Sequence, residues 1–332
     1  MTDNVSSTIV PDYTKPVAEL YLLIAQLVIR ENRSLSILSS VQRANHDEFM
    51  RAYSVGAKNW FNEKAPSWVP QWHYGRTQTL SPAQPHPSFA AASGRTLEWK
   101  AGYDDRILTV RGILVDRVEV SSSTRDDAFS APYPEMLRRQ HEENCLPTEF
   151  RYTKADLEDI ALTLTGGKSW YGLPVSDTSA HLADFASCLV DKCLQWSLSD
   201  ETWHEARFNL QGLVEMLTAV VSPSSFVDEK ELRALAQGGT TKNFLDAAAT
   251  VCKNRARFRT STGMIGIGPQ AMEEGDYVCV LYGAPIPFVI RKRGESYILI
   301  GECYVRDIMN GEAVQKVLDP DNDLEESWIE LS

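Results

Sequence analysis

Two glycine-rich stretches have spacings that occur in nucleotide-binding sites. "GIGPQA" at 266–271 satisfies the G-x-G-x-x-A spacing of a dinucleotide-binding loop, which needs a strand before it and a helix that begins within it. Pro269 and the following "MEEGDY" disfavour that helix. "GGKS" at 166–169 is similar to the end of a phosphate-binding loop, but Leu162 stands where the first glycine belongs. A helix is expected before "GGKS", so we interpret it as a helix C-cap and predict no nucleotide cofactor.

Four acidic residues close to the end of the chain stand at the spacing of a calcium-binding loop: Asp319, Asp321, Asp323 and Glu330. Leu324 replaces the glycine that such a loop requires, and no helix is expected to follow. We therefore interpret residues 315–332 as an acidic tail without a bound metal.

The sequence offers no recognisable nucleophile or transition-metal site. His181, Cys188 and Cys193 share a predicted helix, but gaps of seven and five residues do not place three ligands on one face, so core packing is favoured over zinc. A G-x-S-x-G motif is absent, and six scattered histidines suggest no triad. What remains is a binding or scaffold module, or an enzyme that needs only a shaped pocket. Pericyclic cyclisation is of the latter kind, because holding a substrate in its reactive fold and polarising one carbonyl suffices.

Composition narrows the class of protein. A chain of 332 residues with 43% hydrophobic residues can bury a sizeable core. The net charge of −12 and the absence of a basic cluster exclude nucleic acid as a partner, and "RKRGE" at 291–295 is interpreted as a solvated hairpin turn. Six sparse cysteines fit a reducing compartment, and neither a leader peptide nor a membrane span is predicted. We predict a soluble cytoplasmic protein.

The elements expected in the first part of the chain are helical, then irregular, then extended. Residues 9–56 are predicted to be helical with a break at "ENRS", since Val17, Leu20, Ile24 and Val28 recur at helical spacing. Residues 64–94 combine seven prolines or glycines with three large aromatics, which predicts an ordered loop.

The remaining elements are a hairpin, a helical middle and a β-rich end. Residues 96–120 are predicted to form a β-hairpin, with Gly112 marking a bulge or sharp bend. Residues 122–256 are predicted to be mainly helical, and residues 257–314 are predicted to be β-rich and to precede the acidic tail. We predict an α+β fold in which residues 96–120 and 257–305 build a small β-barrel or curled antiparallel sheet, and residues 1–332 form a single unit.

Several phrases of the sequence resemble the fungal heterokaryon-incompatibility (HET) proteins. "IVPDYTKPVAELY", "SLSILSSV", "PSWVPQW" and "FAAASG" resemble the region that follows the HET domain, and the stretch from "RTSTGMIGIG" to "RDIMNGEAV" resembles their C-terminal segment closely. The resemblance covers about residues 9–94 and 257–314. Only eight residues precede "IVPDY". The cell-death effector domain is therefore expected to be absent, and the resemblance does not imply a cell-death role.

The resemblance also implies a function. HET-like proteins that lack the effector domain act as norbornene-forming Diels-Alderases in fungal terpenoid pathways. By this analogy we predict a cofactor-independent [4+2] cyclase of secondary metabolism that binds a small apolar substrate. Its pocket would be walled by aromatic residues: Trp68, Trp72, Tyr74, Phe288 and Tyr304. Hydrogen bonds to substrate oxygens would come from Arg291, His73 and Tyr282.

Alternatives remain at this point for both the residues and the function. Core packing is the alternative role of each aromatic residue, and Arg291 could instead form a partly buried ion pair with Glu302. The alternative function is a non-catalytic interaction or regulatory module of an incompatibility system, and a hydrolase is a third. The sequence leaves open the substrate, the stereochemistry and the oligomeric state.

Overall fold

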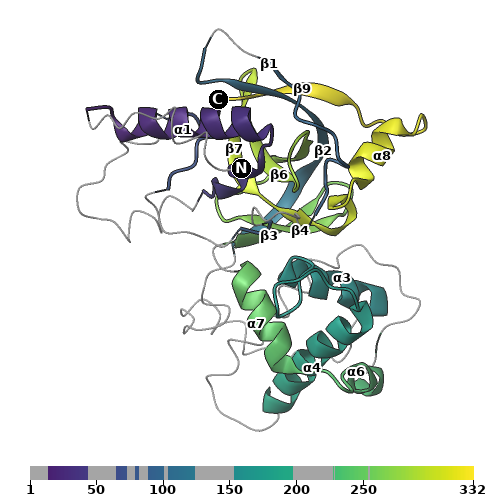
Figure 1. Cartoon of the computed structure of the whole chain (residues 1–332). Coiled ribbons are helices and arrows are strands. Elements are labelled where there is room, and N and C mark those ends of the chain that lie inside the picture. The colour runs from purple at the N-terminus through teal and green to yellow at the C-terminus, as the bar shows by residue number, and fades with distance from the viewer. Residues whose placement is uncertain are drawn as a thin grey trace, which may run out of the picture. The chain divides into compact units, whose positions relative to one another are not determined.

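The structure, a computed structural model, divides the chain into two compact units (Figure 1). Unit 1 comprises Met1–Ser121 and Thr260–Ser332, and unit 2 comprises Ser122–Arg259. The described residues are 14–43, 65–72, 79–81, 89–100, 104–123, 153–196, 227, 229–252 and 255–332. Unit 2 is thus inserted between two segments of unit 1. The expectation that residues 1–332 form a single α+β unit remains a prediction.

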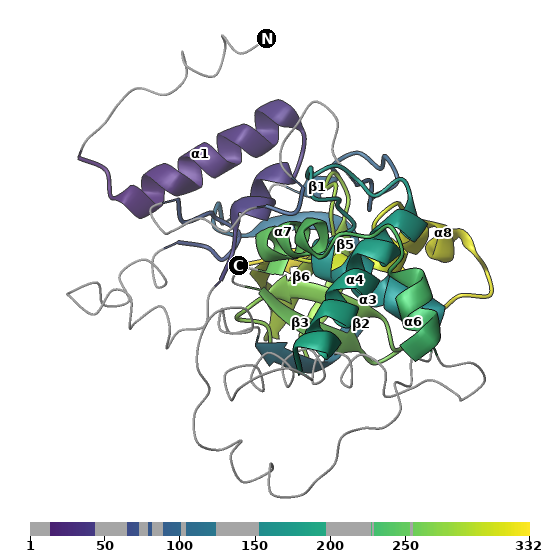
Figure 2. The ribbon, with the colours of Figure 1, turned by 90° about the horizontal axis from the view of Figure 1, so that it is seen from below.

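The strands form one curled sheet, visible from two directions in Figures 1 and 2. Its strands are β1 (Trp99–Lys100), β2 (Leu108–Ser123), β3 (Arg255–Thr260), β4 (Ile265–Pro269), β5 (Tyr277–Leu281), β6 (Phe288–Arg293), β7 (Ser296–Glu302), β8 (Tyr304–Val305) and β9 (Glu326–Leu331). Their order is β5-β6-β7-β9-β2-β3-β4-β8, with β1 paired to β2. The pairings of β5 with β6 and of β6 with β7 are antiparallel, whereas β7 and β9 pair in parallel. The predicted α+β class with a curled sheet from 96–120 and 257–305 is confirmed.

The long strand β2 is the reason that the sheet curls. Its first half, from Leu108 to Ile113, pairs with β9, and its second half, from Gly112 to Arg117, pairs with β5. A register shift between Leu114 and Asp116 bends the strand, as β-bulges do. Gly112 lies where the two pairings overlap. A Cβ atom there would lie 2.6 Å from the carbonyl oxygen of Val280, so a side chain is excluded by backbone.

Replacing Gly112 by alanine is expected to lower the free energy of unfolding by about 2 kcal/mol, because β2 must move away from β5 to admit the methyl group. Chemical denaturation of the purified chain measures this loss. Gly263→Ala is the matched control, since nothing lies within 4 Å of its added Cβ and only the strain of φ +92° remains, about 1 kcal/mol. A Gly112 variant no less stable than this control would show that the strands do not approach so closely.

The interpretation of residues 315–332 as an acidic tail is wrong. This segment contains the end of helix α8 (Glu312–Leu318) and strand β9, which lies between β7 and β2 within the sheet. Ile329 and Leu331 are completely buried, while Glu330 between them is exposed. The physical reason is period-two alternation, because apolar side chains on one face of a strand suffice to hold it against the core. Acidic residues on the other face then obscure the pattern.

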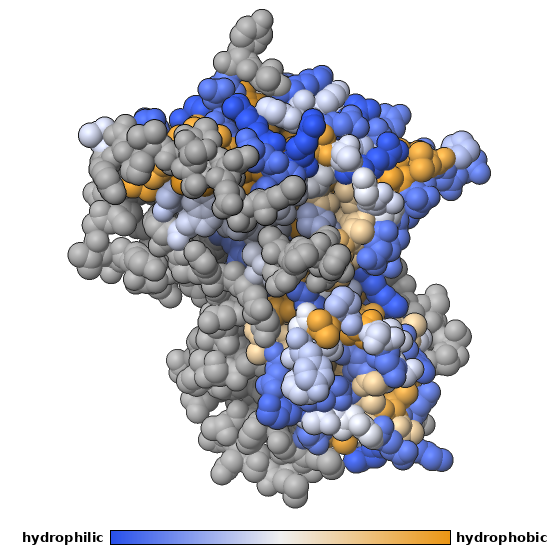
Figure 3. Space-filling view, in the orientation of Figure 1, coloured by the Kyte–Doolittle hydropathy of each residue, from blue (hydrophilic) through white to orange (hydrophobic). Residues whose placement is uncertain are grey.

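Helix α1 (Val17–Asn32) covers part of unit 1 and confirms the break expected at "ENRS". Arg33 follows it in the left-handed conformation with φ 48°, and a short 3-10 helix, η1 (Ser36–Ser40), continues the chain. A further 3-10 turn, η5 (Arg306–Ile308), precedes α8. The helix expected to continue after the break is wrong for residues 41–43, where Gln42 forms an antiparallel bridge with Gly301, and residues 9–13 and 44–56 lie outside the described residues. Figure 3 shows hydrophobic residues over α1 and at the end of α8 on an otherwise mostly hydrophilic face.

The described parts of the loop segment 64–94 contain neither helix nor strand. Trp68 and Leu80 are each 1% exposed, and the backbone amide of Ser67 donates to the carbonyl oxygen of Ser332 at 2.9 Å. The hydroxyl of Ser67 in turn accepts a hydrogen bond from the amide of Leu299 at 2.9 Å. These contacts order the coil by fixing it to β7 and to the end of β9.

Unit 2 is a helical unit built from α3 (Lys154–Thr165), α4 (Thr178–Trp196), α6 (Glu229–Leu235) and α7 (Thr241–Cys252). A capping box of Thr153 and Asp156 begins α3. The rings of Phe185 and Phe244, 4.7 Å apart, join α4 to α7 in the core. The chain breaks between α6 and α7 at Gly238, whose φ is +80°.

A buried histidine makes unit 2 sensitive to acid. His181 of α4 is 7% exposed, and its Nε2 lies 2.9 Å from the hydroxyl of Thr165, which itself donates to the carbonyl oxygen of Ala161. The hydrogen of the Thr165 hydroxyl is engaged with that carbonyl oxygen, which leaves the hydroxyl oxygen to accept a hydrogen bond from Nε2–H of a neutral His181. Burial lowers the pKa of His181 below its ordinary 6.5, although Asp184 opposes the shift. The folded unit therefore favours the neutral ring.

Stability is accordingly expected to fall as the pH drops below 6.5, since the unfolded chain then binds a proton that the folded chain does not. The extra loss is at most ~1.4 kcal/mol per pH unit for one proton. Urea unfolding between pH 7.5 and 5 measures it. In the control His181→Gln, whose amide can still donate to Thr165, this part of the pH dependence should vanish. Equal pH slopes for both proteins would contradict the assignment.

Candidate functional site

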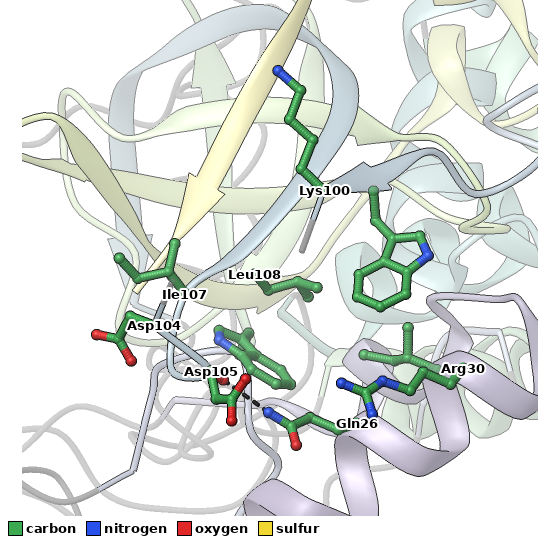
Figure 4. Close-up of a pocket in the computed structure, with 10 residues that line it drawn as sticks. Gln26, Arg30, Lys100, Asp104, Asp105, Ile107 and Leu108 are labelled. Atoms are coloured by element: carbon green, nitrogen blue, oxygen red, sulfur yellow. Dashed lines mark hydrogen bonds between the residues drawn. The ribbon is translucent and has the colours of Figure 1, made fainter. Parts of the chain in front are cut away.

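A groove in unit 1 lies between the second half of α1 and the residues around β1 and the start of β2 (Figure 4). Its lining consists of Gln26, Ile29, Arg30, Trp68, Trp99, Lys100, Asp104, Asp105, Ile107 and Leu108. The cavity volume is about 50 Å³. Sites that enclose a drug-sized ligand have roughly 300–1,000 Å³. The groove can therefore hold one end of a small molecule and not the whole of a terpenoid.

The floor and walls of the groove are largely apolar. Trp68 comes from the ordered coil, and its indole N–H donates to the carbonyl oxygen of Arg106 at 2.9 Å, which fixes the ring. Trp99 of β1 is 37% exposed and forms the outer wall. Both indoles have a fixed orientation, one through its hydrogen bond and the other through its strand, and the exposed apolar surface comes mainly from Trp99 because Trp68 is 1% exposed.

The lining of the groove includes both basic and acidic residues. The guanidinium of Arg30 lies 5.7 Å from the ring centroid of Trp99, a cation–π arrangement. Gln26, one helical turn before Arg30, donates its side-chain amide to the carbonyl oxygen of Asp105 at 2.8 Å and so ties α1 to the opposite side (Figure 4). Lys100 points away from the groove, and its ammonium lies 4.0 Å from the ring centroid of Trp328. Arg30 is thus the cation that lies at the mouth.

Trp68 is the one residue of the predicted site that lines this groove among the described residues. Trp72 packs edge-on against Tyr21 of α1, with ring centroids 4.9 Å apart. His73 and Tyr74 lie outside the described residues.

Tyr282 belongs to a polar cluster rather than to the groove. Its side chain is completely buried, and its hydroxyl donates to Oε1 of Glu326 at 2.5 Å. Arg95 and Arg111 also pair with Glu326, at 3.5 and 3.4 Å. Burial and the neighbouring Glu326 carboxylate raise the pKa of Tyr282, whereas the hydrogen bond from Tyr282 lowers the pKa of Glu326. This hydroxyl already has its acceptor, so it serves to hold β9 near β5.

Arg291 forms a partly buried ion pair with Asp276 rather than with Glu302. Its Nε and Nη2 donate to the two carboxylate oxygens of Asp276 at 2.7 and 3.0 Å, and Nη2 also donates to the carbonyl oxygen of Ala271 at 2.8 Å. Glu273 adds a third carboxylate oxygen at 3.2 Å. The hydrogen bond to Asp276 raises the pKa of Arg291. Its guanidinium is engaged in fixing the turn before β5.

Phe288 and Tyr304 are core residues. Phe288 is completely buried in β6, opposite Cys279 and Glu302. Tyr304 is 4% exposed and packs edge-on against Phe89 at 5.8 Å. Phe288, Tyr304 and Tyr282 are therefore core residues, which was the alternative role left open for each aromatic residue.

The sequence reasoning missed Arg30 and Trp99. Gln26 and Arg30 stand four residues apart in a helix, which places both on one face, and Ile29 adjoins that face. In the sequence, Trp99 is an aromatic residue of the predicted hairpin 96–120. Only the approach of α1 to β1, which no local pattern encodes, brings these residues together.

The motifs that could have carried other chemistry have structural roles. Gly166 caps α3 in the left-handed conformation, and "GIGPQ" lies mostly in strand β4 rather than opening a helix. Burial raises the pKa of Cys252 to about 11, so its thiol stays protonated. Within the described ranges, His, Cys, Asp and Glu side chains do not gather in threes as metal ligands would. In that same part of the chain, no helix has the length and apolar character to cross a membrane.

Comparison with known proteins relates part of the chain to the HET proteins. Residues 214–321 match the Het-6 β-barrel domain. Heterokaryon incompatibility protein 6, OR allele, of Neurospora crassa is 41% identical over 59 residues, which are 17% of this chain and 9% of that relative. No solved structure matches. Because so little of the relative is covered, the match carries no information on the activity of the whole protein.

Proposed function

We propose that this chain, related to HET proteins through residues 214–321, is a cofactor-independent cyclase that folds an apolar substrate for an intramolecular [4+2] reaction. The resemblance to the HET-like Diels-Alderase that forms the norbornene of sordaricin supports the reaction class. The observation that carries the proposal is the groove, in which two indole rings and one guanidinium, of Trp68, Trp99 and Arg30, adjoin.

The proposed cycloaddition needs few catalytic side chains. In a [4+2] cycloaddition the diene and the dienophile of one molecule form two carbon–carbon bonds, and no proton, electron or leaving group is exchanged with the protein. Catalysis then consists of holding the reacting ends together and of polarising the dienophile. The groove has room for one end of the substrate, so the remainder of the molecule would extend along the surface beyond Trp99.

The residues divide into two roles under this proposal. Trp68 and Trp99 hold the apolar end, because their ring faces exclude water on two sides. Arg30 donates a hydrogen bond to a carbonyl oxygen conjugated with the dienophile, which lowers the barrier because charge accumulates on that oxygen in the transition state. Of the predicted site residues that the structure describes, Trp68 alone keeps its place in this arrangement.

The test is to incubate the purified chain with a linear or cyclopentadiene-bearing terpenoid precursor and to follow the cyclised product by chromatography. We expect a rate above that of buffer, with one stereoisomer in excess, and no change when a metal chelator is added. A rate equal to buffer would eliminate the cyclase function. Loss of the rate with chelator would eliminate the cofactor-independent mechanism.

The non-catalytic alternative, an interaction or regulatory module, has one observation in its favour, the small volume of the groove. It predicts that the chain leaves both rate and stereoisomer ratio of the precursor unchanged. The same assay therefore separates the two functions.

A further inference from the structure

The loop that joins α3 to α4 exposes three large apolar side chains of unit 2. Trp170 is 44% exposed, Tyr171 70% and Leu173 64%. The two aromatic rings lie against each other with centroids 3.6 Å apart. We call these three residues the aromatic tip. Exposed apolar groups this close together usually mark a surface that contacts another apolar phase.

Backbone hydrogen bonds hold the aromatic tip in one conformation. Ser169 donates its amide to the carbonyl oxygen of Leu173 at 2.8 Å, and Gly172 donates back to that of Ser169 at 2.8 Å. Gly172 has φ +77°, which closes the turn at little cost for glycine. Lys168 and Pro174 form an antiparallel bridge at its base. The tip is therefore preorganised, and its insertion into a binding partner or another phase costs little conformational entropy.

The charge around the aromatic tip is distinctive. No charged residue occurs from Ser169 to Ser176, whereas the chain as a whole carries a net charge of −12. An uncharged tip on an acidic protein is not steered toward a charged partner, and anionic lipid would repel the rest of the molecule. The tip is suited to an uncharged apolar environment.

We propose that the aromatic tip inserts into the interface of a zwitterionic lipid bilayer and holds the chain there reversibly. Trp and Tyr favour this interface because an apolar ring and a polar N–H or O–H are satisfied at the same depth. A protein partner is disfavoured by area, since three side chains fall far short of the roughly 1,200 Å² that a stable protein–protein interface buries. A bilayer surrounds a convex tip on all sides and needs no complementary shape.

The experiment is binding of the full chain to sonicated phosphatidylcholine vesicles, followed by cosedimentation at low salt. We expect measurable binding that falls at least about tenfold when Trp170, Tyr171 and Leu173 are all replaced by serine, because that removes most of the inserted apolar surface. Phosphatidylglycerol vesicles should bind less than phosphatidylcholine vesicles. Leu318→Ser is the matched control, since Leu318 is 60% exposed on α8 of unit 1, and it should bind as the unaltered chain does.

The proposal fails if the unaltered chain does not bind phosphatidylcholine, if binding requires anionic lipid, or if the serine variant binds equally well. Size-exclusion chromatography at several concentrations tests the other occupant, a second copy of the chain. Self-association that the serine substitutions abolish would overturn the membrane assignment. Circular dichroism of the variant confirms that unit 2 remains helical, which is expected because all three substituted side chains are solvent-exposed.

Discussion

Asp276→Ala is expected to lower the free energy of unfolding by about 3 kcal/mol, because it leaves the Arg291 guanidinium partly buried without its main acceptor. Asp276 is 2% exposed and Arg291 31%, so water cannot fully replace the lost carboxylate. The substitution also removes the acceptor of the Glu273 amide, which lies 2.9 Å from Oδ2 of Asp276. Both effects loosen the turn that leads into β5.

Glu273→Ala is the matched control for this measurement. Glu273 contacts the same guanidinium at 3.2 Å but is 68% exposed, and an exposed ion pair contributes less than about 1 kcal/mol. Urea unfolding of both variants beside the unaltered chain gives the two losses. Similar values for Asp276→Ala and Glu273→Ala would show that burial does not distinguish the two carboxylates.

Arg30→Met is expected to lower the rate of the cyclisation about 100-fold with stability nearly unchanged, because one preorganised hydrogen-bond donor to the developing charge is lost. Methionine keeps apolar contact with Trp99 but cannot donate. Product formation from the terpenoid precursor at saturating substrate measures the change. The loss should appear mainly in kcat, since the apolar walls that bind the substrate are retained.

Arg293→Met provides the control, since Arg293 is exposed at the end of β6 and does not line the groove. It should cyclise the precursor as the unaltered chain does. An Arg30 variant with full activity would remove Arg30 from the mechanism while leaving the cyclase function to the assay with the unaltered chain.

The fold class could be predicted because its patterns are local. β-branched runs and turn residues marked 96–120 and 257–305 as extended, and the glycines after Thr165 marked the end of α3. Strand β9 was missed because its buried residues, Ile329 and Leu331, alternate with acidic ones, so composition favoured a tail. Patterns of spacing predict elements, whereas the place of a strand in a sheet depends on partners far away in the sequence.

The candidate site was predicted much less well, and the reason is physical. Tyr282 directly follows strand β5 and Phe288 begins β6, and an aromatic residue at such a position can belong to a pocket wall or to the core. Whether such a ring faces a cavity depends on packing between distant segments. Trp68 was found because the aromatic, proline-rich coil suggested an ordered loop, and Arg30 was not, because nothing in α1 indicates that β1 lies beside it.

The position of β9 bears on how the chain folds as it is synthesised. Leu331 is the register partner of Leu108, so this pairing closes a loop of more than 200 residues, in which the whole of unit 2 lies. On the ribosome, unit 2 is synthesised before β5 and β9, two of the strands that pair with β2. The edge of β2 that β9 covers therefore stays unpaired until β9 has been synthesised, and a folded unit 2 shortens the flexible part of the loop that has to close.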